Sequence, residues 1–173
     1  MKLAAVFLLL LAACSKQPSL PAGTVQYESI DGAFSCAAPA TWRLQEADGG
    51  AHRVSFFGPP DGPAPFSESI VVYRHGPKTG MPTPESFFAS RATAGVPAMP
   101  RTVAVGRQQG LEASYDTVVN SPHFSGGRQA LSNRAVLITD ADGYWAFVHT
   151  WPTAISPRSR VLDGVLETFH PKP

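Results

Sequence analysis

Residues that could carry out catalysis are few in this chain of 173 residues, and they lie far apart. Arg74-His75-Gly76 places an imidazole that could accept a phosphoryl group beside a guanidinium that could neutralise its charge. That chemistry needs a second histidine and further arginines around the phosphate, and Pro77 follows the motif directly. We therefore interpret the motif as the end of a strand at the surface.

A serine nucleophile would need a strained turn such as Gly-x-Ser-x-Gly, and the sequence contains none. His123 and Ser125 share a loop with Gly126 and Gly127, but a catalytic triad also needs an orienting carboxylate. We expect a polar surface loop there. The sequence therefore predicts no catalytic residue, and a hydrolase is the least favoured function.

The histidines and acidic residues do not have the spacing of metal ligands. The five histidines lie at positions 52, 75, 123, 149 and 170, without i, i+4 pairs or paired cysteines. Asp140-Ala141-Asp142-Gly143 is too short for a calcium-binding loop and suits a hairpin turn. We predict no metal and no cofactor.

Large aromatic residues gather on one side of a predicted strand near the C-terminus. The residues of equal strand parity are Trp145, Phe147, His149 and Trp151. Alternate residues of a strand point to the same face, so these four would lie together. Two interpretations remain open: a core face with a hydrogen-bonded histidine, or a cleft that binds a ligand or a partner. We treat the four as a possible binding face.

The first residues have the pattern of an export signal. Lys2 precedes an apolar run from Leu3 to Ala13, which is too short for a transmembrane helix. Leu11-Ala12-Ala13-Cys14 resembles the lipobox of bacterial lipoproteins. The resemblance implies a signal peptide at 1–13, lipidation of Cys14 and a lipidated tether at 14–23. Ser15, which is not an aspartate, implies the outer membrane, with the protein facing the periplasm of the cell envelope.

The amino-acid composition limits the kinds of partner that the protein is expected to bind. Lys2 is one of 14 basic residues, so 13 remain against 13 acidic ones after the signal peptide, and no basic stripe is present. Binding of nucleic acid is therefore not expected. Cys36 has no second cysteine to pair with once Cys14 is lipidated, and its parity with Phe34 predicts a place in the core.

Apolar alternation predicts strands at 34–37, 42–45, 52–58, 67–75, 102–106 and 111–119, and a hairpin at 134–151. The 67–75 strand is apolar on both sides, which predicts a central place in the sheet. One helix should open at Thr83-Pro84-Glu85, present Phe87, Phe88 and Ala92 to the core, and stop at Gly95. A second should open at Ser156-Pro157, with an apolar stripe ending at Phe169. This order predicts an α+β fold in which helices flank an antiparallel β-sheet.

Several short segments in this order resemble the PsbP-like family, in particular its bacterial lipoproteins of the DcrB type. They are Phe34–Trp42, with Pro39 between, Ser69–Val72, Gly110–Tyr115, the Asp142–Trp145 hairpin and the closing helix. The resemblance covers residues 27 to 170. It implies an α/β/α sandwich over a single domain at 24–173, and no shared active site.

We therefore expect a lipoprotein held on the membrane through Cys14, acting as a non-enzymatic interaction or assembly module with a protein partner. The alternative is a protein that binds a small ligand or a cell-wall component.

Overall fold

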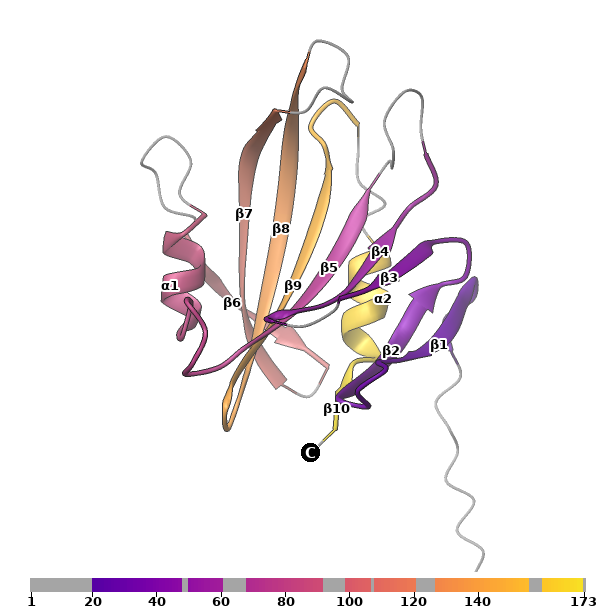
Figure 1. The fold of residues 1–173 in the computed structure, drawn as a ribbon. Helices are drawn as coiled ribbons and strands as arrows, with labels where there is room; N and C mark the ends of the chain where they lie inside the picture. The colour runs from indigo at the N-terminus through magenta and orange to yellow at the C-terminus, as the bar shows by residue number, and fades with distance from the viewer. Residues whose placement is uncertain are drawn as a thin grey trace, which may run out of the picture.

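The computed structural model describes residues 20–47, 50–60, 68–91, 99–106, 108–120, 127–155 and 160–172. These residues form ten strands in two antiparallel sheets, together with two short helices (Figure 1). No helix among them is long and apolar enough to span a membrane.

The larger sheet has seven strands in the order β3-β4-β5-β9-β8-β7-β6. β5 pairs with β4 on one side and β9 on the other, which confirms the central position predicted for the 67–75 strand. The bounds in chain order are β3 (Arg43–Glu46), β4 (His52–Phe57), β5 (Ser69–His75), β6 (Arg101–Val105), β7 (Gln108–Asn120), β8 (Arg128–Asp140) and β9 (Gly143–Pro152).

The predicted hairpin at 134–151 is confirmed as β8 and β9, which pair from Asp140↔Gly143 outward. Gly143 has a φ of +147°, and a Cβ atom there would lie 2.0 Å from the backbone oxygen of His75. Only glycine allows the hairpin to pass this close to the end of β5.

A second sheet is formed by β1 (Thr24–Glu28), β2 (Phe34–Pro39) and β10 (His170–Pro171), in the order β1-β2-β10. The sequence predicted the strand at Phe34 but neither of its neighbours. β10 has only two residues and follows the closing helix, so it joins the last residues of the domain to one of its first strands.

The first helix, α1 (Pro84–Ala89), is capped as predicted. The Thr83 hydroxyl accepts a hydrogen bond from the Ser86 backbone N–H at 3.2 Å, and the Ser86 hydroxyl accepts one from the Thr83 N–H at 3.2 Å. Phe87 and Phe88 are buried, also as predicted. The helix ends six residues before Gly95, and the predicted Ala92 and Gly95 lie outside the described residues.

The second helix, α2 (Arg160–Glu167), buries Leu162, Val165 and Leu166 against the larger sheet. Phe169, which follows it, is also buried, so the predicted apolar stripe is confirmed at its C-terminal end. Its predicted start at Ser156-Pro157 lies outside the described residues.

The prediction of an α/β/α sandwich with helices flanking the sheet is wrong. One face of the larger sheet packs against the small sheet together with α2, around a core that includes Phe34, Phe147 and Leu162. The other face carries α1, which has only six residues. The fold is therefore rich in strands, because β1 and β10 pair with β2 in a second sheet. The sequence had predicted that only helices pack against the larger sheet.

Candidate functional site

The four residues of the possible binding face lie mostly in the interior. Trp145, Phe147 and His149 are 3%, 0% and 1% exposed. The ring of Trp145 lies 5.2 Å from that of Phe34, so the small sheet covers this end of the face. Trp151 is half-buried, with its ring 5.0 Å from His149. The four share one side of β9, but three of them offer no surface to a partner.

His149 is held by a carboxylate 81 positions away in the chain. Its Nε2 lies 2.8 Å from Oε2 of Glu68, and both side chains are almost completely buried. Burial lowers the pKa of His149, and the hydrogen bond that Glu68 accepts from it opposes this shift. This is the hydrogen-bonded core histidine that was one of the two interpretations of the face.

Arg74-His75-Gly76 does end a strand, but its residues have structural partners. The Arg74 guanidinium donates to the backbone oxygen of His75 at 2.6 Å and to Asp140 at 2.8 Å, and it lies over the ring of Trp145. His75 is 6% exposed, so the expectation of a surface position is wrong for this residue. An arginine already paired in this way is not arranged for phosphoryl transfer.

The other residues singled out from the sequence lie outside the described residues or in the core. Cys14, His123 and Ser125 lie outside the described residues. Cys36 is fully buried and unpaired, and burial raises the pKa of its thiol to about 12. Within the described ranges, no group of three or more histidine, cysteine or acidic residues could hold a metal ion.

Hollows lie between α2 and the edge strand β6. Two adjoining hollows, of about 340 and 480 Å³, share Val105, Gly106, Leu166 and Glu167 in their walls. We call them together the β6 groove. Val103 and Val136 line one part, and Ile138 and Phe169 line the other. The groove is thus apolar along its floor and runs beside the last strand of the sheet.

Gly110 on β7 lies beneath two valines of the groove. A Cβ atom at Gly110 would lie 3.2 Å and 3.6 Å from the methyl groups of Val105 and Val136, and 2.9 Å from the backbone oxygen of Leu137. Glycine therefore allows the two valines to pack closely over the backbone of β7.

Charged side chains connect the wall of the groove to the sheet. The Arg134 guanidinium donates to Glu112 at 2.7 Å and to Asp163 of α2 at 2.7 Å. Arg101 at the start of β6 lies 3.4 Å from the other oxygen of Glu112. Glu112 is buried, so this network fixes α2 over the sheet while Asp163 remains 45% exposed at the rim.

This groove was not predicted from the sequence, although both of its walls were. The strand at 102–106 and the stripe of the closing helix were predicted, but the order of strands that makes β6 an edge depends on pairings between distant segments. Gly110 was a local signal, since glycine inside a strand often marks a close approach of neighbouring side chains.

No protein-family model and no curated protein matches the sequence. Solved structures do match, and they define the class of fold: this chain has a PsbP-like fold, of the strand-rich kind shared with Mog1.

The particular structures are distant in sequence. The Ran-binding protein Mog1p of Saccharomyces cerevisiae matches with a TM-score of 0.52 and 14% identity, over 88% of this chain and 96% of that one. The cyanobacterial PsbP of Synechocystis matches with a TM-score of 0.50 and 14% identity, over 94% of this chain and 99% of that one. A protein of Bacteroides thetaiotaomicron matches with a TM-score of 0.56 and 12% identity, over 87% of this chain. This chain spans 49% of the length of that protein.

Proposed function

We propose that this protein is a lipid-anchored, non-enzymatic interaction module of the bacterial cell envelope, which binds an extended segment of a partner protein along β6. The observation that carries the proposal is a groove with apolar residues along its floor and charged residues at its rim, beside an edge strand. Among the described residues no strand pairs with the outer side of β6, so its backbone groups there can pair with another chain.

The chemistry of the groove suggests the kind of segment that fits. An extended chain alternates its side chains, so every second one could enter the groove between Val105 and Leu166. Asp163 and Glu167 of α2 form the acidic rim. A segment with alternating apolar residues and a lysine or arginine near this rim would therefore bind best.

Two further points support an interaction module over an enzyme. The described residues place no nucleophile and base together in the groove. One protein of similar fold is the Ran-binding protein Mog1p. By analogy with it we propose a binding role, but not Ran binding, for this chain. The membrane attachment rests on Cys14 and its lipobox, as does the location on the periplasmic side of the outer membrane.

The test uses a photo-crosslinking amino acid at Ala104, which is exposed on β6, in the full chain expressed in its own cells. The matched control carries the same group at Val25, which is 50% exposed on the edge strand β1 of the other sheet. A partner crosslinked from Ala104 and not from Val25 is expected. A synthetic peptide of the crosslinked segment should then bind the purified protein.

Groove variants sharpen the result. Val103→Lys should weaken binding of that peptide because a long cationic chain occupies the groove wall, whereas Val25→Lys should not. Circular dichroism should show that both variants stay folded. If no segment crosslinks from Ala104, or if both positions capture the same proteins equally, strand addition along β6 is wrong.

A further inference from the structure

β6 is an edge strand whose own sequence has the pattern expected of a segment bound at the β6 groove. Arg101, Val103 and Val105 alternate along it with Thr102 and Ala104. Val103 and Val105 pack against the core beneath α2, whereas Thr102 and Ala104 are exposed. Because alternate residues of a strand point to the same face, β6 presents one basic and two apolar side chains on the side of the groove.

The free side of β6 follows from its hairpin with β7. Val105 pairs with Gln108, so two residues lie between them in the turn. A hydrogen bond between the flanking residues closes such a turn, and hydrogen-bonded pairs then alternate along an antiparallel ladder. Val105 and Val103 therefore bond to β7, while Thr102 and Ala104 direct their N–H and C=O groups outward. Among the described residues no strand pairs with this outer side.

A second copy of the chain fits this outer side in an antiparallel arrangement about a two-fold axis. The register that pairs all five residues of β6 places Val103 opposite Val103 of the second copy, and Arg101 opposite Val105. Residues opposite one another in an antiparallel pair of strands share a face of the sheet. Arg101 of one copy would therefore lie on the groove side of the other, and the two Val103 side chains would meet at the axis.

This register brings opposite charges together. The Arg101 side chain is 77% exposed, although its guanidinium lies 3.4 Å from Glu112 of its own sheet. Glu167 of α2 is exposed and lines both hollows together with Val105, and none of the ion pairs within the described residues includes it. Because Arg101 stands opposite Val105 of the second copy, its long side chain can reach the Glu167 beside that valine. The two-fold axis forms this ion pair twice.

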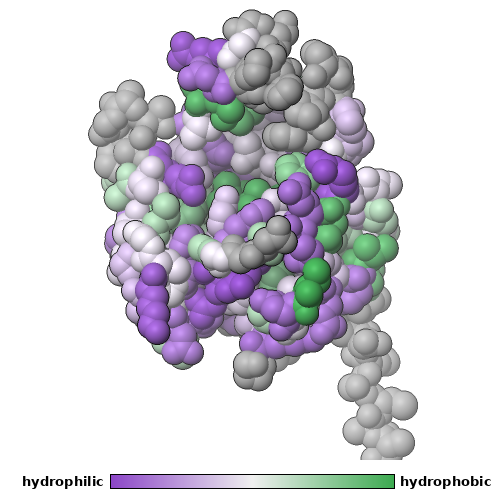
Figure 2. Space-filling view, in the orientation of Figure 1, coloured by the Kyte–Doolittle hydropathy of each residue, from purple (hydrophilic) through white to green (hydrophobic). Residues whose placement is uncertain are grey.

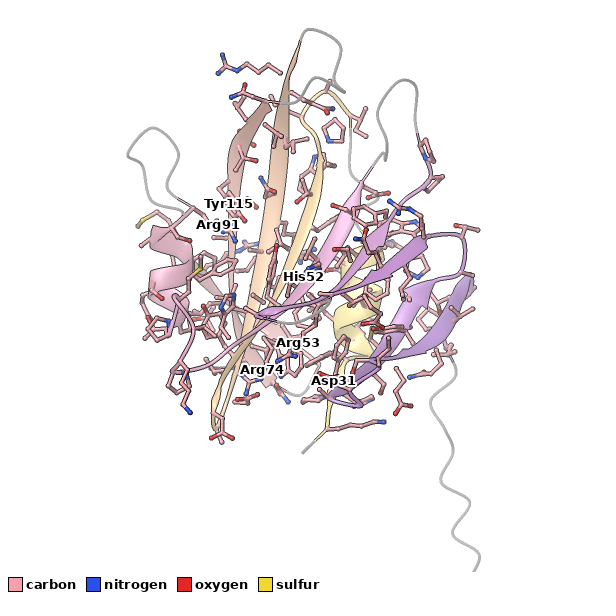
Figure 3. The ribbon with its side chains drawn as sticks, in the orientation of Figure 1. Asp31, His52, Arg53, Arg74, Arg91 and Tyr115 are labelled. Atoms are coloured by element: carbon pink, nitrogen blue, oxygen red, sulfur yellow. The ribbon has the colours of Figure 1, made fainter. Side chains whose placement is uncertain are left out.

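Other described parts of the surface are less suited to a second copy. The edge strand β1 exposes Val25, but this residue lines neither hollow. Beside the small sheet, Arg53 already has an acidic partner, since it lies 3.3 Å from Asp31, and Figure 3 shows these two side chains near one another. On the face that carries α1, Figure 2 shows apolar residues scattered among polar ones. The β6 groove combines an apolar floor, a free strand edge and unlike charges.

We propose that, in the absence of its partner, this protein forms a symmetric dimer in which the two β6 strands pair and Arg101 of each copy binds Glu167 of the other. The inference rests on the proposed function, because both require that β6 accept another strand. It adds regulation to that function, since the partner segment must displace the second copy before it occupies the groove. Lipid anchoring in one membrane raises the local concentration of the copies and favours the dimer.

Val103→Cys in the full chain, oxidised in native membranes with copper phenanthroline, tests the position of the two-fold axis. Opposed residues that are not hydrogen-bonded have Cα atoms about 4.5 Å apart, which suits a disulfide. A dimer on non-reducing gels is therefore expected. Ala104→Cys is the control, because the two Ala104 residues are diagonal neighbours, about 7–8 Å apart, and should give much less dimer. Cys36 is fully buried and should not contribute.

Charge reversal tests the ion pair. Arg101→Glu and Glu167→Arg each place like charges at both contacts, and each should weaken the dimer at least about tenfold in sedimentation equilibrium of the full chain in detergent. A mixture of the two variants restores opposite charges at both contacts, so a mixed dimer should form with nearly the wild-type affinity. Arg43→Glu, at the other edge of the same sheet, is the control and should leave the dimer unchanged. Circular dichroism should show that each variant is folded.

Three outcomes would overturn the proposal: the full chain is monomeric in detergent and gives no disulfide in membranes, Val103→Cys crosslinks no better than Ala104→Cys, or the mixed charge variants stay monomeric. A partner peptide that binds and leaves the dimer intact would also contradict it. Failure of the proposed function gives a different result. The photo-crosslinker at Ala104 would then capture this chain alone, whereas capture of another protein without any dimer would refute only the inference drawn here.

Discussion

Buried histidines determine how the folding stability of this protein is expected to depend on pH. His75 is buried among aromatic rings, and neither of its ring nitrogens has a hydrogen-bond partner among the residues that the structure describes. Burial lowers its pKa. In the unfolded chain its pKa returns to about 6.5. As the pH falls through that value, the unfolded state takes up a proton that the folded state refuses, so folding stability is lost on the acid side.

His75→Phe should therefore be more stable than the wild type, by about 1–3 kcal/mol, because it keeps the ring packing and removes a buried polar group without partners. Its stability should also fall less between pH 7 and pH 5. Urea unfolding across this range measures both effects.

Some acid sensitivity should persist in His75→Phe, because burial also lowers the pKa of His149. His170→Phe changes an exposed histidine and is the control. A variant that is less stable than the wild type at pH 7, or equally sensitive to acid, would show that His75 is hydrogen-bonded in solution.

What the sequence could predict at this scale depended on distance along the chain. The core position of Cys36 followed from its parity with Phe34, a local pattern. The partner of His149 could not be found, because Glu68 lies 81 positions away in the chain, just before β5. His75 was expected at the surface, since no local pattern shows that α1 folds back over the end of its strand.

At the scale of elements, α1 is a short helix whose ends matter more than its length. Six residues contribute little helical stability by themselves, so capping and the burial of Phe87 and Phe88 hold the helix in place. Arg91 follows the same helix, and its guanidinium lies over the ring of Phe87.

Thr83→Ala should lower the free energy of unfolding by about 1 kcal/mol, because the Ser86 N–H loses its acceptor. Thr83→Ser keeps the hydroxyl and should lie within a few tenths of a kcal/mol of the wild type. Chemical denaturation compares the two. Equal stability of the alanine and serine variants would mean that the cap contributes nothing.

Replacing either of two glycines by alanine should change the stability of the protein, in opposite directions. Gly164 lies inside α2 with open space around it, so Gly164→Ala should stabilise the protein by about 1 kcal/mol through helix propensity. Gly143→Ala would place a Cβ atom 2.0 Å from the His75 oxygen at a φ of +147° and should destabilise by several kcal/mol. Melting temperatures of the two variants, measured side by side, should move in opposite directions; a shift of the same sign would contradict the geometry of the hairpin.

Elements were more predictable than their pairing. Alternation found the strands of the larger sheet and the capped start of α1, because both are local signals. The small sheet was not found, since β1 shows little apolar pattern and β10 has two residues that only become a strand beside β2. Sheet order, and with it the edge position of β6, is set by contacts between segments far apart in the chain.

At the scale of the whole molecule, the larger sheet has two unlike faces. One face packs against the small sheet and α2 and borders the β6 groove, and the other face carries α1. The fold class was predicted only in its resemblance to PsbP, and the expected sandwich of helices failed because one layer is largely a second sheet.

The proposed membrane anchor concerns the chain as a whole. Cys14 lies ten residues before Thr24, the first residue of β1, so its lipid would hold the domain near the membrane without entering its core. Cys14→Ser should therefore remove labelling by palmitate and release the protein from the membrane fraction, because the acyl chains that hold it are gone. Its melting temperature should equal that of the wild type, since the described fold begins after this residue.

Cys36→Ser is the control for loss of a thiol, and it should keep both the label and the membrane location. A Cys14→Ser protein that stays in membranes after a carbonate wash would mean that another part of the chain anchors it. A soluble Cys14→Ser protein that no longer crosslinks its partner from Ala104, while still binding the partner peptide in solution, would show that the anchor acts by concentrating the β6 groove at the membrane.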